Sequence, residues 1–217
     1  MKLALFDLDN TLLGGDSDYL WGQFLVEHNR VDKAVYAREN QRFYEEYQQG
    51  KLDIHAFLRF QLAPLAQYAY ADLLQWRAQF LEQKIKPIVL PAAVALVERH
   101  RQQGDTLVMI TATNAFITAP IAQWFQIPHL LATEPEFLAG RYTGGVVGTP
   151  CFQQGKVTRL QAWLEQQQAT LSESWFYSDS HNDLPLLTQV SHPVAVDPDP
   201  TLRHHAEAQQ WPILNLR

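Results

Sequence analysis

The sequence predicts an α/β protein with a doubly wound, Rossmann-like parallel-sheet core and an all-helical cap inserted after the first strand. Leu3–Phe6 is a run of four apolar residues that stops at an acid, which is typical of a buried strand. In residues 88–217, short apolar runs alternate with helical patterns, as in parallel sheets. Residues 16–87 carry helical patterns without a strand signal, and that stretch is too long for a loop. We therefore expect residues 1–15 and 88–217 to form the core and residues 16–87 the cap.

Composition is that of a globular protein and excludes several kinds of partner. Apolar residues make up 47% of the 217 residues and charged residues 18%, unlike a disordered chain. The net charge of -6 and the lack of a basic run argue against nucleic-acid binding. We expect no membrane span and no signal peptide, because no apolar stretch is long enough and few residues precede Asp7. Cys151 is the single cysteine, so no internal disulfide forms and a cytoplasmic location is expected.

The cap region is expected to contain four helices, three of which have an acidic residue at the start. Asp16, Asp32 and Asp53 each precede an apolar-periodic stretch, where a carboxylate can accept a hydrogen bond from a free backbone N–H. Gly50 follows the second stretch and is a typical helix stop. The four expected helices run from residue 16 or 17 to 29, from 32 to 49, from 53 through 62, and from 71 to 84.

Helices and strands are expected to alternate after residue 88. Pro91 suits the first turn of a helix, and Gly104 suits its end. A second buried strand, residues 106–110, is expected to stop at Thr111. The remaining expected elements are a helix through residues 117–124, a β-hairpin at 136–147, a helix opened by Lys156, and strands at 175–177 and 194–196.

Polar side chains follow three of the predicted strands. Asp7 and Asp9 follow the first, Thr111 follows the second, and Asp179 and Asp183 follow the third. Because the carboxyl ends of parallel strands share one edge of the sheet, we expect these side chains to converge there. Lys156, at the start of the expected helix before the third of these strands, adds a positive charge. Such a set suits a hard divalent cation beside a phosphate, whereas no cluster of histidine and cysteine has the spacing of a zinc site.

These residues resemble the four ordered motifs of the haloacid dehalogenase superfamily. The motifs are Asp7-Leu8-Asp9-Asn10-Thr11, Thr111, Lys156, and Asp179-Ser180-His181-Asn182-Asp183. The helical insert resembles the branch that contains phosphoserine phosphatase and related histidinol-phosphate phosphatases. The resemblance implies a Mg²⁺-dependent phosphomonoester hydrolase that acts through an aspartyl phosphate on a small, amine-bearing phosphorylated metabolite.

The resemblance also implies a role for each motif residue. Asp7 is the expected nucleophile, and Asp9 the acid and base that protonates the leaving alcohol and then activates water. The expected phosphate-binding residues are Thr111, Ala112, Lys156 and Asn182. The expected metal site comprises Asp7, Asp9 through its backbone carbonyl, Asp179 and Asp183. A lid over the site is expected as well, because this reaction needs water excluded, and the helical insert suits that role.

The substrate is left open at this stage. Asp16 stands where phosphoserine phosphatases carry a glutamate that meets the substrate amine, although it also suits a helix N-cap. Three arginines of the cap, Arg38, Arg42 and Arg59, are candidates for binding a substrate carboxylate. We expect a phosphoserine-phosphatase-like hydrolase, with a histidinol-phosphate phosphatase as the alternative. Asn10 and the run Thr111-Ala112-Thr113 depart from the phosphoserine enzyme, so histidinol phosphate and phosphoethanolamine stay open beside phosphoserine. So do a phospho-accepting signalling module and an inactive binding protein, and no oligomeric state is predicted.

Overall fold

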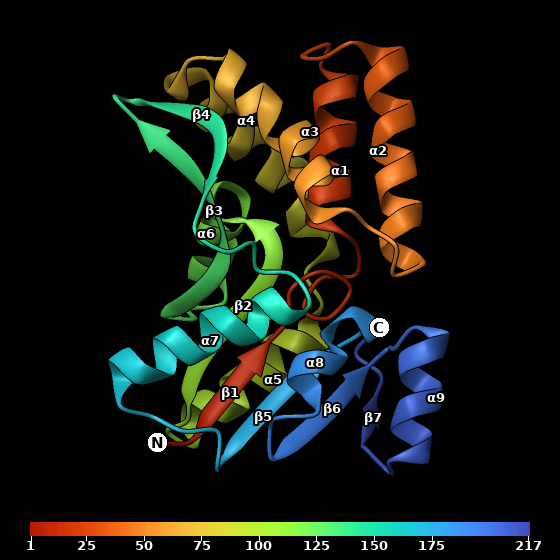
Figure 1. Ribbon diagram of the computed structural model, residues 1–217, viewed down its shortest axis with the longest axis vertical. Helices are drawn as coiled ribbons and strands as arrows, with labels where there is room; N and C mark the ends of the chain where they lie inside the picture. Colours follow the sequence, from red (N-terminus) through yellow and green to blue (C-terminus); the bar gives the residue numbers. More distant parts are fainter.

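The computed structural model describes residues 1–217 and contains one seven-stranded sheet (Figure 1). The strand order is β4-β3-β2-β1-β5-β6-β7, parallel throughout except for β4, which is antiparallel to β3. The bounds are β1 Leu3–Phe6, β2 Thr106–Asn114, β3 His129–Leu138, β4 Arg141–Val147, β5 Ser174–Ser178, β6 His192–Val196 and β7 Ile213–Leu214. This confirms the predicted α/β fold with a parallel sheet.

The central strand is apolar on both faces because helices cover both sides of the sheet. Ala4 and Phe6 belong to one buried cluster, and Leu3 and Leu5 to another, as the period of two along a strand requires. Helices α5 (Pro91–Gln102) and α6 (Ala115–Trp124) pack on the first face. Helices α7 (Gln154–Gln167), α8 (Leu184–Leu187) and α9 (Pro200–Ala208) pack on the second, which faces the viewer in Figure 1.

Four helices lie between β1 and α5 in the chain and lie in the upper part of Figure 1, with α1 and α2 at the right and α4 nearer to β4. Asp16, Asp32 and Asp53 cap the first three, each accepting a backbone N–H from inside its helix. The expected fourth helix, 71–84, ends as an α-helix at Phe80 and continues as a π-helical turn, Leu81–Ile85. The bounds are α1 Ser17–Glu27, α2 Lys33–Gln48, α3 Ile54–Gln67 and α4 Tyr70–Phe80, followed by a 3-10 turn at Lys86–Ile88.

The inserted helices share an apolar core with the sheet domain. Trp21 of α1 packs edge-on against Phe80, with ring centroids 5.1 Å apart, and against Phe116 of α6 at 5.9 Å. All three rings are buried in the cluster that also contains Phe6 of β1. Burying aromatic rings of this size fixes α1 and the end of α4 against α6.

The strand β2 is longer than the sequence predicts. The prediction stops it at Thr111, but the extended backbone continues to Asn114, which pairs with Thr133 of β3 after a register shift. Thr111, Thr113 and Asn114 are polar although they are buried, and their polarity hides this continuation in the sequence. The predicted hairpin is present, and its first strand, β3, also joins the parallel sheet.

None of the helices combines the length and hydropathy needed to cross a membrane.

Candidate active site

Asp7 ends the buried strand β1 and is held by two donors. Its backbone N–H still pairs with the carbonyl of Tyr177, which fixes the position of the side chain. Oδ1 accepts a hydrogen bond from Lys156 Nζ at 2.8 Å, and Oδ2 accepts one from Thr11 Oγ1 at 3.2 Å. Burial raises the pKa of Asp7 to about 7, while Lys156 acts in the opposite direction. Asp7 is therefore a desolvated carboxylate with a fixed orientation.

Lys156 lies in the first turn of α7 and bridges two carboxylates. Its Nζ is 2.8 Å from Asp7 Oδ1 and 2.7 Å from Asp183 Oδ2, and all three side chains are buried. Ser178 Oγ donates a further bond to Asp183 Oδ2 at 2.7 Å. Burial acts to lower the pKa of Lys156, but Asp183 and Asp7 together raise it above its ordinary value. The lysine is thus a permanent positive charge beside Asp7.

Thr11 joins Asp7 to Asp179, which follows β5. Its Oγ1 lies 3.2 Å from Asp7 Oδ2 and 3.3 Å from Asp179 Oδ1, and it accepts the backbone N–H of Asp179 at 3.1 Å. One hydroxyl proton cannot satisfy both carboxylates. Burial, together with Asp7 and Asp183, raises the pKa of Asp179 well above its ordinary value, and no ion pair to Asp179 forms within the chain. Two partly unpaired carboxylates therefore meet at one hydroxyl.

The donor set around Thr11 fits a hard divalent cation. No group of three or more His, Cys, Asp or Glu side chains is arranged to enclose a metal ion. Mg²⁺ needs only one or two carboxylates and takes its other ligands from water and phosphate, so Asp7 and Asp179 suffice. The Asp183 carboxylate, by contrast, is held by Lys156 and Ser178. The structure therefore favours Asp7 and Asp179 as the carboxylate ligands and Asp183 as a residue that positions Lys156.

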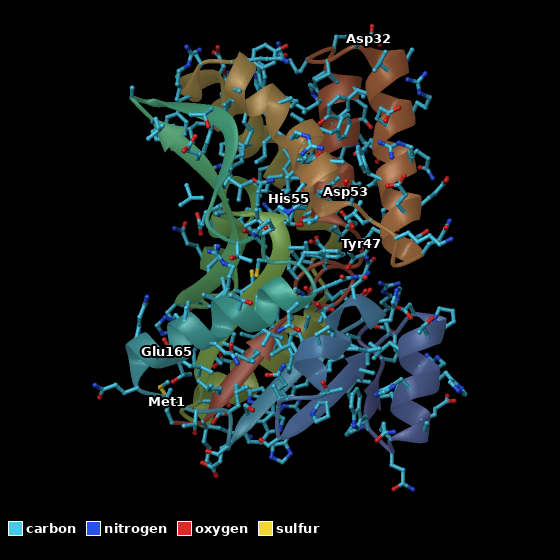
Figure 2. The ribbon with its side chains drawn as sticks, in the orientation of Figure 1. Met1, Asp32, Tyr47, Asp53, His55 and Glu165 are labelled. Carbon is cyan, nitrogen blue, oxygen red and sulfur yellow. The ribbon has the colours of Figure 1, made fainter.

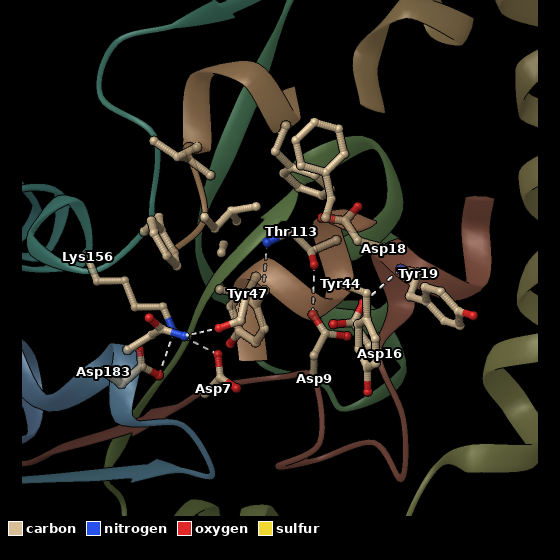
Figure 3. Close-up of a pocket in the computed structure, with 18 of the residues that line it drawn as sticks. Asp7, Asp9, Asp16, Asp18, Tyr19, Tyr44, Tyr47, Thr113, Lys156 and Asp183 are labelled. Carbon is tan, nitrogen blue, oxygen red and sulfur yellow. Dashed lines mark hydrogen bonds and ion pairs between the residues drawn. The ribbon is translucent and has the colours of Figure 1, made fainter. Parts of the chain in front are cut away.

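Asp9 is oriented by two donors from different elements. The backbone N–H of Ser17 donates to Oδ1 at 2.6 Å. Thr113 Oγ1 donates to Oδ2 at 2.7 Å (Figure 3). Burial raises the pKa of Asp9, although both hydrogen bonds lower it. A carboxyl whose pKa is raised and whose orientation is fixed is suited to deliver a proton to a bound molecule.

One pocket joins these groups to the inserted helices and contains about 640 Å³ of empty space, part of it open to solvent. Lys156, Asp183 and Asp7 lie at one end, while Asp16, Asp18 and Tyr19 lie at the other (Figure 3). Lys156 is the single lysine or arginine of the lining. The walls between are apolar and aromatic, and include Phe43, Tyr44, Tyr47, Leu52, Ile54, Phe57 and Phe152.

Asn182 connects the pocket to the end of α2. Its Nδ2 donates to the carbonyl of Tyr47 at 3.2 Å, and its Oδ1 accepts from Gln153 Nε2 at 2.9 Å. Tyr47 lies at the end of α2 that meets the sheet, whereas Asp32 lies at the far end of that helix (Figure 2). The inserted helices therefore contact the sheet domain directly beside the pocket.

The geometry is matched by similarity to known proteins. The model of the haloacid dehalogenase-like hydrolases matches residues 4–188. The chain belongs to this family. A histidinol-phosphatase from Neisseria meningitidis serogroup C (strain 8013) is 45% identical over 100% of this chain and 99% of that protein. Phosphoserine phosphatase SerB1 of Mycobacterium tuberculosis is 28% identical over 99% of this chain and 70% of its own length.

Solved structures agree with this hydrolase in fold. A protein of unknown function from Bordetella pertussis Tohama I superposes with a TM-score of 0.94 at 44% identity, covering 100% of this chain and 99% of that one. A substrate-bound phosphoserine phosphatase superposes with a TM-score of 0.73 at 17% identity, covering 98% of this chain and 92% of that one. The second likeness is one of fold. Family membership and the named relatives together make this hydrolase a phosphatase.

The structure of this hydrolase brings most of the predicted site residues together but leaves the arginines outside. Asp7, Asp9, Thr111, Ala112, Lys156, Asn182 and Asp183 all line the pocket, and Asp179 adjoins it through Thr11. Arg42 lies on the exposed face of α2, paired with Glu39 and Glu46, and Arg38 also pairs with Glu39. Arg59 is exposed on α3, and none of the three lines the pocket.

Asp16 is a helix cap and a pocket residue at once. Its Oδ1 accepts the backbone N–H of Tyr19 at 2.8 Å, and the side chain lines the pocket. Burial, together with Asp9 and Asp18, raises the pKa of Asp16 well above its ordinary value. The two interpretations that the sequence leaves open therefore do not exclude each other.

Sequence reasoning assigned no role to three residues that organise this hydrolase's pocket, although Thr11 and Thr113 stand within runs that it singles out. Thr11 and Thr113 hold the acids described above, and Asp18 faces the end of the pocket away from Lys156. A hydroxyl two residues after Thr111 was a usable signal for Thr113. Asp18 sits in the first turn of α1, where an acid is common for electrostatic reasons, so its position alone gave no signal.

Proposed function

We propose that this hydrolase is a Mg²⁺-dependent phosphatase of histidinol phosphate. The observation that carries the proposal is the charge arrangement of the pocket, with the single cation Lys156 at one end and Asp16 and Asp18 at the other. The phosphoryl group would lie at Lys156, and the rest of the substrate would extend toward the two carboxylates. The 45% identical relative named histidinol-phosphatase supports the same substrate.

The choice of histidinol phosphate over phosphoserine follows from the missing arginine. Phosphoserine carries a carboxylate besides its amine, and that carboxylate would face acidic residues with no cation to pair with. Histidinol phosphate carries an amine and an imidazole ring and has no carboxylate. Its ring also suits the aromatic wall formed by Phe43, Tyr44 and Phe57. Asp16, which lies beside Asp9 in the pocket (Figure 3), is the proposed partner of the amine.

The chemistry proceeds in two displacements. Asp7 attacks phosphorus, the bond from phosphorus to the ester oxygen breaks, and Asp9 gives its proton to that oxygen, which releases histidinol. Water then attacks the phosphoryl group on Asp7 and passes a proton back to Asp9, and the bond from Asp7 to phosphorus breaks to release phosphate. Lys156, Thr111 and the backbone at Ala112 hold the phosphoryl oxygens. Mg²⁺ bound at Asp7, Asp179 and the carbonyl of Asp9 would neutralise charge on those oxygens.

A phospho-accepting module without turnover is the other class of function that the sequence leaves open. It has no use for a second acid, yet Asp9 is held by two donors and points into the pocket. Family membership also favours an enzyme. We therefore favour an enzyme that releases phosphate over a module that only accepts the phosphoryl group.

The test is phosphate release by the purified protein from histidinol phosphate, phosphoserine and phosphoethanolamine, with Mg²⁺ and with EDTA. We expect the highest kcat/KM for histidinol phosphate and no turnover in EDTA. A higher kcat/KM for phosphoserine would overturn the proposed substrate. Phosphorylation of the protein without phosphate release would overturn the enzymatic function.

A further inference from the structure

Asp18 is a buried carboxylate that the chain holds from one side only. Gln61 Nε2 donates to Asp18 Oδ1 at 3.0 Å, and Asn114 Nδ2 donates to the same oxygen at 3.3 Å. Gln61 and Asn114 are themselves buried and lie outside the pocket lining, so they support Asp18 from behind. Asp18 itself lines the pocket and is 7% exposed.

The support behind Asp18 is a chain of hydrogen bonds across four elements. Gln61 of α3 also donates to the backbone carbonyl of Asp18 at 3.0 Å and lies 3.4 Å from the hydroxyl of Tyr36 in α2. Asn114 ends β2. Such a network leaves the carboxylate one orientation, in which Oδ2 is not used by these donors. The Thr113 hydroxyl lies nearby, but its proton is directed to Asp9 at 2.7 Å.

Asp18 has no cationic partner within the protein. No salt bridge reaches it, and the pocket's single cation, Lys156, is bound to Asp7 and Asp183 at the opposite end (Figure 3). A buried carboxylate without a counter-charge is costly, and a folded chain keeps one only where something compensates. The pocket in front of Asp18 is where a donor from a bound molecule can supply that compensation.

The order of groups along the pocket matches the order of groups along the substrate. In histidinol phosphate, the amine is two carbons from the ester oxygen, and the imidazole ring lies further out on the same chain. Asp16 immediately precedes Ser17, whose N–H holds Asp9, and lies beside Asp9 in Figure 3, whereas Asp18 is held by Gln61 of the inserted helix α3. The nearer carboxylate therefore suits the amine and the farther one suits the ring.

We propose that Asp18 accepts a hydrogen bond from an imidazole N–H of the substrate, so that it selects phosphomonoesters with a nitrogen heterocycle beyond the amine. This inference rests on the proposed function and adds the residue that reads the ring. Gln61 and Asn114 are positioning residues, because they act on the substrate through Asp18.

The experiment compares kcat/KM for histidinol phosphate with kcat/KM for phosphoethanolamine, which has the amine but no ring. Asp18→Asn is expected to lower the ratio of the two by about tenfold to a hundredfold, the size of one hydrogen bond to a charged group. Asp16→Asn should lower both values and leave their ratio within about twofold of wild type, which is within one weak interaction. Asp72→Asn, an exposed acid in the first turn of α4, is the matched control and should change neither value.

A second measurement separates recognition from folding. Histidinol binding by titration calorimetry should weaken in Asp18→Asn, while thermal unfolding should show a protein at least as stable as wild type. If the wild type prefers histidinol phosphate and Asp18→Asn keeps the full ratio, Asp18 does not read the ring and the proposed function stands. If the wild type shows no preference for histidinol phosphate over phosphoserine, both the function and the role of Asp18 are overturned.

Discussion

The hydroxyl of Thr113 donates a 2.7 Å hydrogen bond to Oδ2 of Asp9, which ties the end of β2 to the loop after β1. This contact orients the proposed general acid, and it comes from a strand that pairs directly with β1. The backbone N–H of Ser17, in the first turn of α1, holds the other oxygen. Asp9 is thus oriented jointly by the sheet and by the inserted helices.

Asp9→Asn should remove both proton transfers. We expect kcat for histidinol phosphate to fall by about 10²–10⁴, the usual contribution of a general acid and base. The phosphorylated form of Asp7 should accumulate and be visible by mass spectrometry of the quenched protein. Thr113→Val is the matched variant, and its kcat for histidinol phosphate should fall by only about tenfold, because one hydrogen bond to Asp9 is lost. With p-nitrophenyl phosphate, whose leaving group needs no proton, the fall in kcat of Thr113→Val should be smaller. Equal rates for wild type and Asp9→Asn would refute the role of Asp9.

The pKa of Asp18 predicts how stability depends on pH. Burial raises it from 3.8 to about 7, so the folded protein holds this proton over a range in which the unfolded chain has released it. This term lowers the free energy of unfolding as pH rises from about 4 to about 7, and it is constant above that range. Asp18→Asn removes it.

The difference in melting temperature between Asp18→Asn and wild type, measured in EDTA, should therefore be small near pH 4. It should grow in favour of the variant up to about pH 7 and then stay constant. Asp72→Asn, whose parent side chain is exposed, should follow the wild type at every pH. A variant that is less stable than wild type at pH 8 would show that the carboxylate contributes to folding.

The sequence predicts the structure of the sheet better than it predicts the residues of the pocket. The strand at Leu3–Phe6 and the acids after it are local signals, because a buried parallel strand is apolar on both faces and carboxylates are expelled to its end. The parallel fold follows from repeating this pattern. The end of β2 was predicted too early, because Thr111, Thr113 and Asn114 are polar and yet buried, so their polarity does not mark the end of the strand.

For the inserted helices, the sequence does not predict which side chains face the pocket. Arg42 and Asp18 are both charged residues of helices, and nothing in the local sequence says which one faces the pocket. The packing of α1 against α2 and α3 decides it, turning Asp18 toward Gln61 and leaving Arg42 beside Glu39 and Glu46. Such a choice depends on contacts between residues far apart in the chain, which a helical period does not encode.

Gly50, in the α2–α3 connection beside the sheet domain, should be needed for both stability and activity. Its φ is +68°, and a Cβ there would lie 2.6 Å from Nε2 of His181, whose Nδ1 is held 2.7 Å from Asp199. Gly50→Ala should lose about 1–2 kcal/mol of unfolding free energy from the left-handed backbone. It should also lower kcat/KM, because His181 lies between Asp179 and Asn182 in the chain.

Gly140 is the matched control for this change. Its φ is +81°, but no atom lies within 4 Å of the position that a Cβ would take at the tip of the β3–β4 turn. Gly140→Ala should therefore cost similar stability, measured by urea unfolding, and keep full kcat/KM. If Gly50→Ala also keeps full kcat/KM, the contact between Gly50 and His181 has no part in turnover.

Asp179 and Asp183 should respond differently to the same substitution, because Asp179 is a proposed metal ligand and Asp183 contacts Lys156. Asp179→Asn removes a charged ligand from the pair that meets at Thr11, so the Mg²⁺ concentration for half-maximal activity should rise by at least about tenfold. Asp183→Asn instead weakens the hold on Lys156 Nζ, so kcat should fall at saturating Mg²⁺ with a smaller change in the Mg²⁺ requirement. The measurement is a Mg²⁺ titration of phosphate release for both variants. The opposite pattern would make Asp183 the metal ligand, since only the residue that binds the ion couples its own charge directly to the ion's affinity.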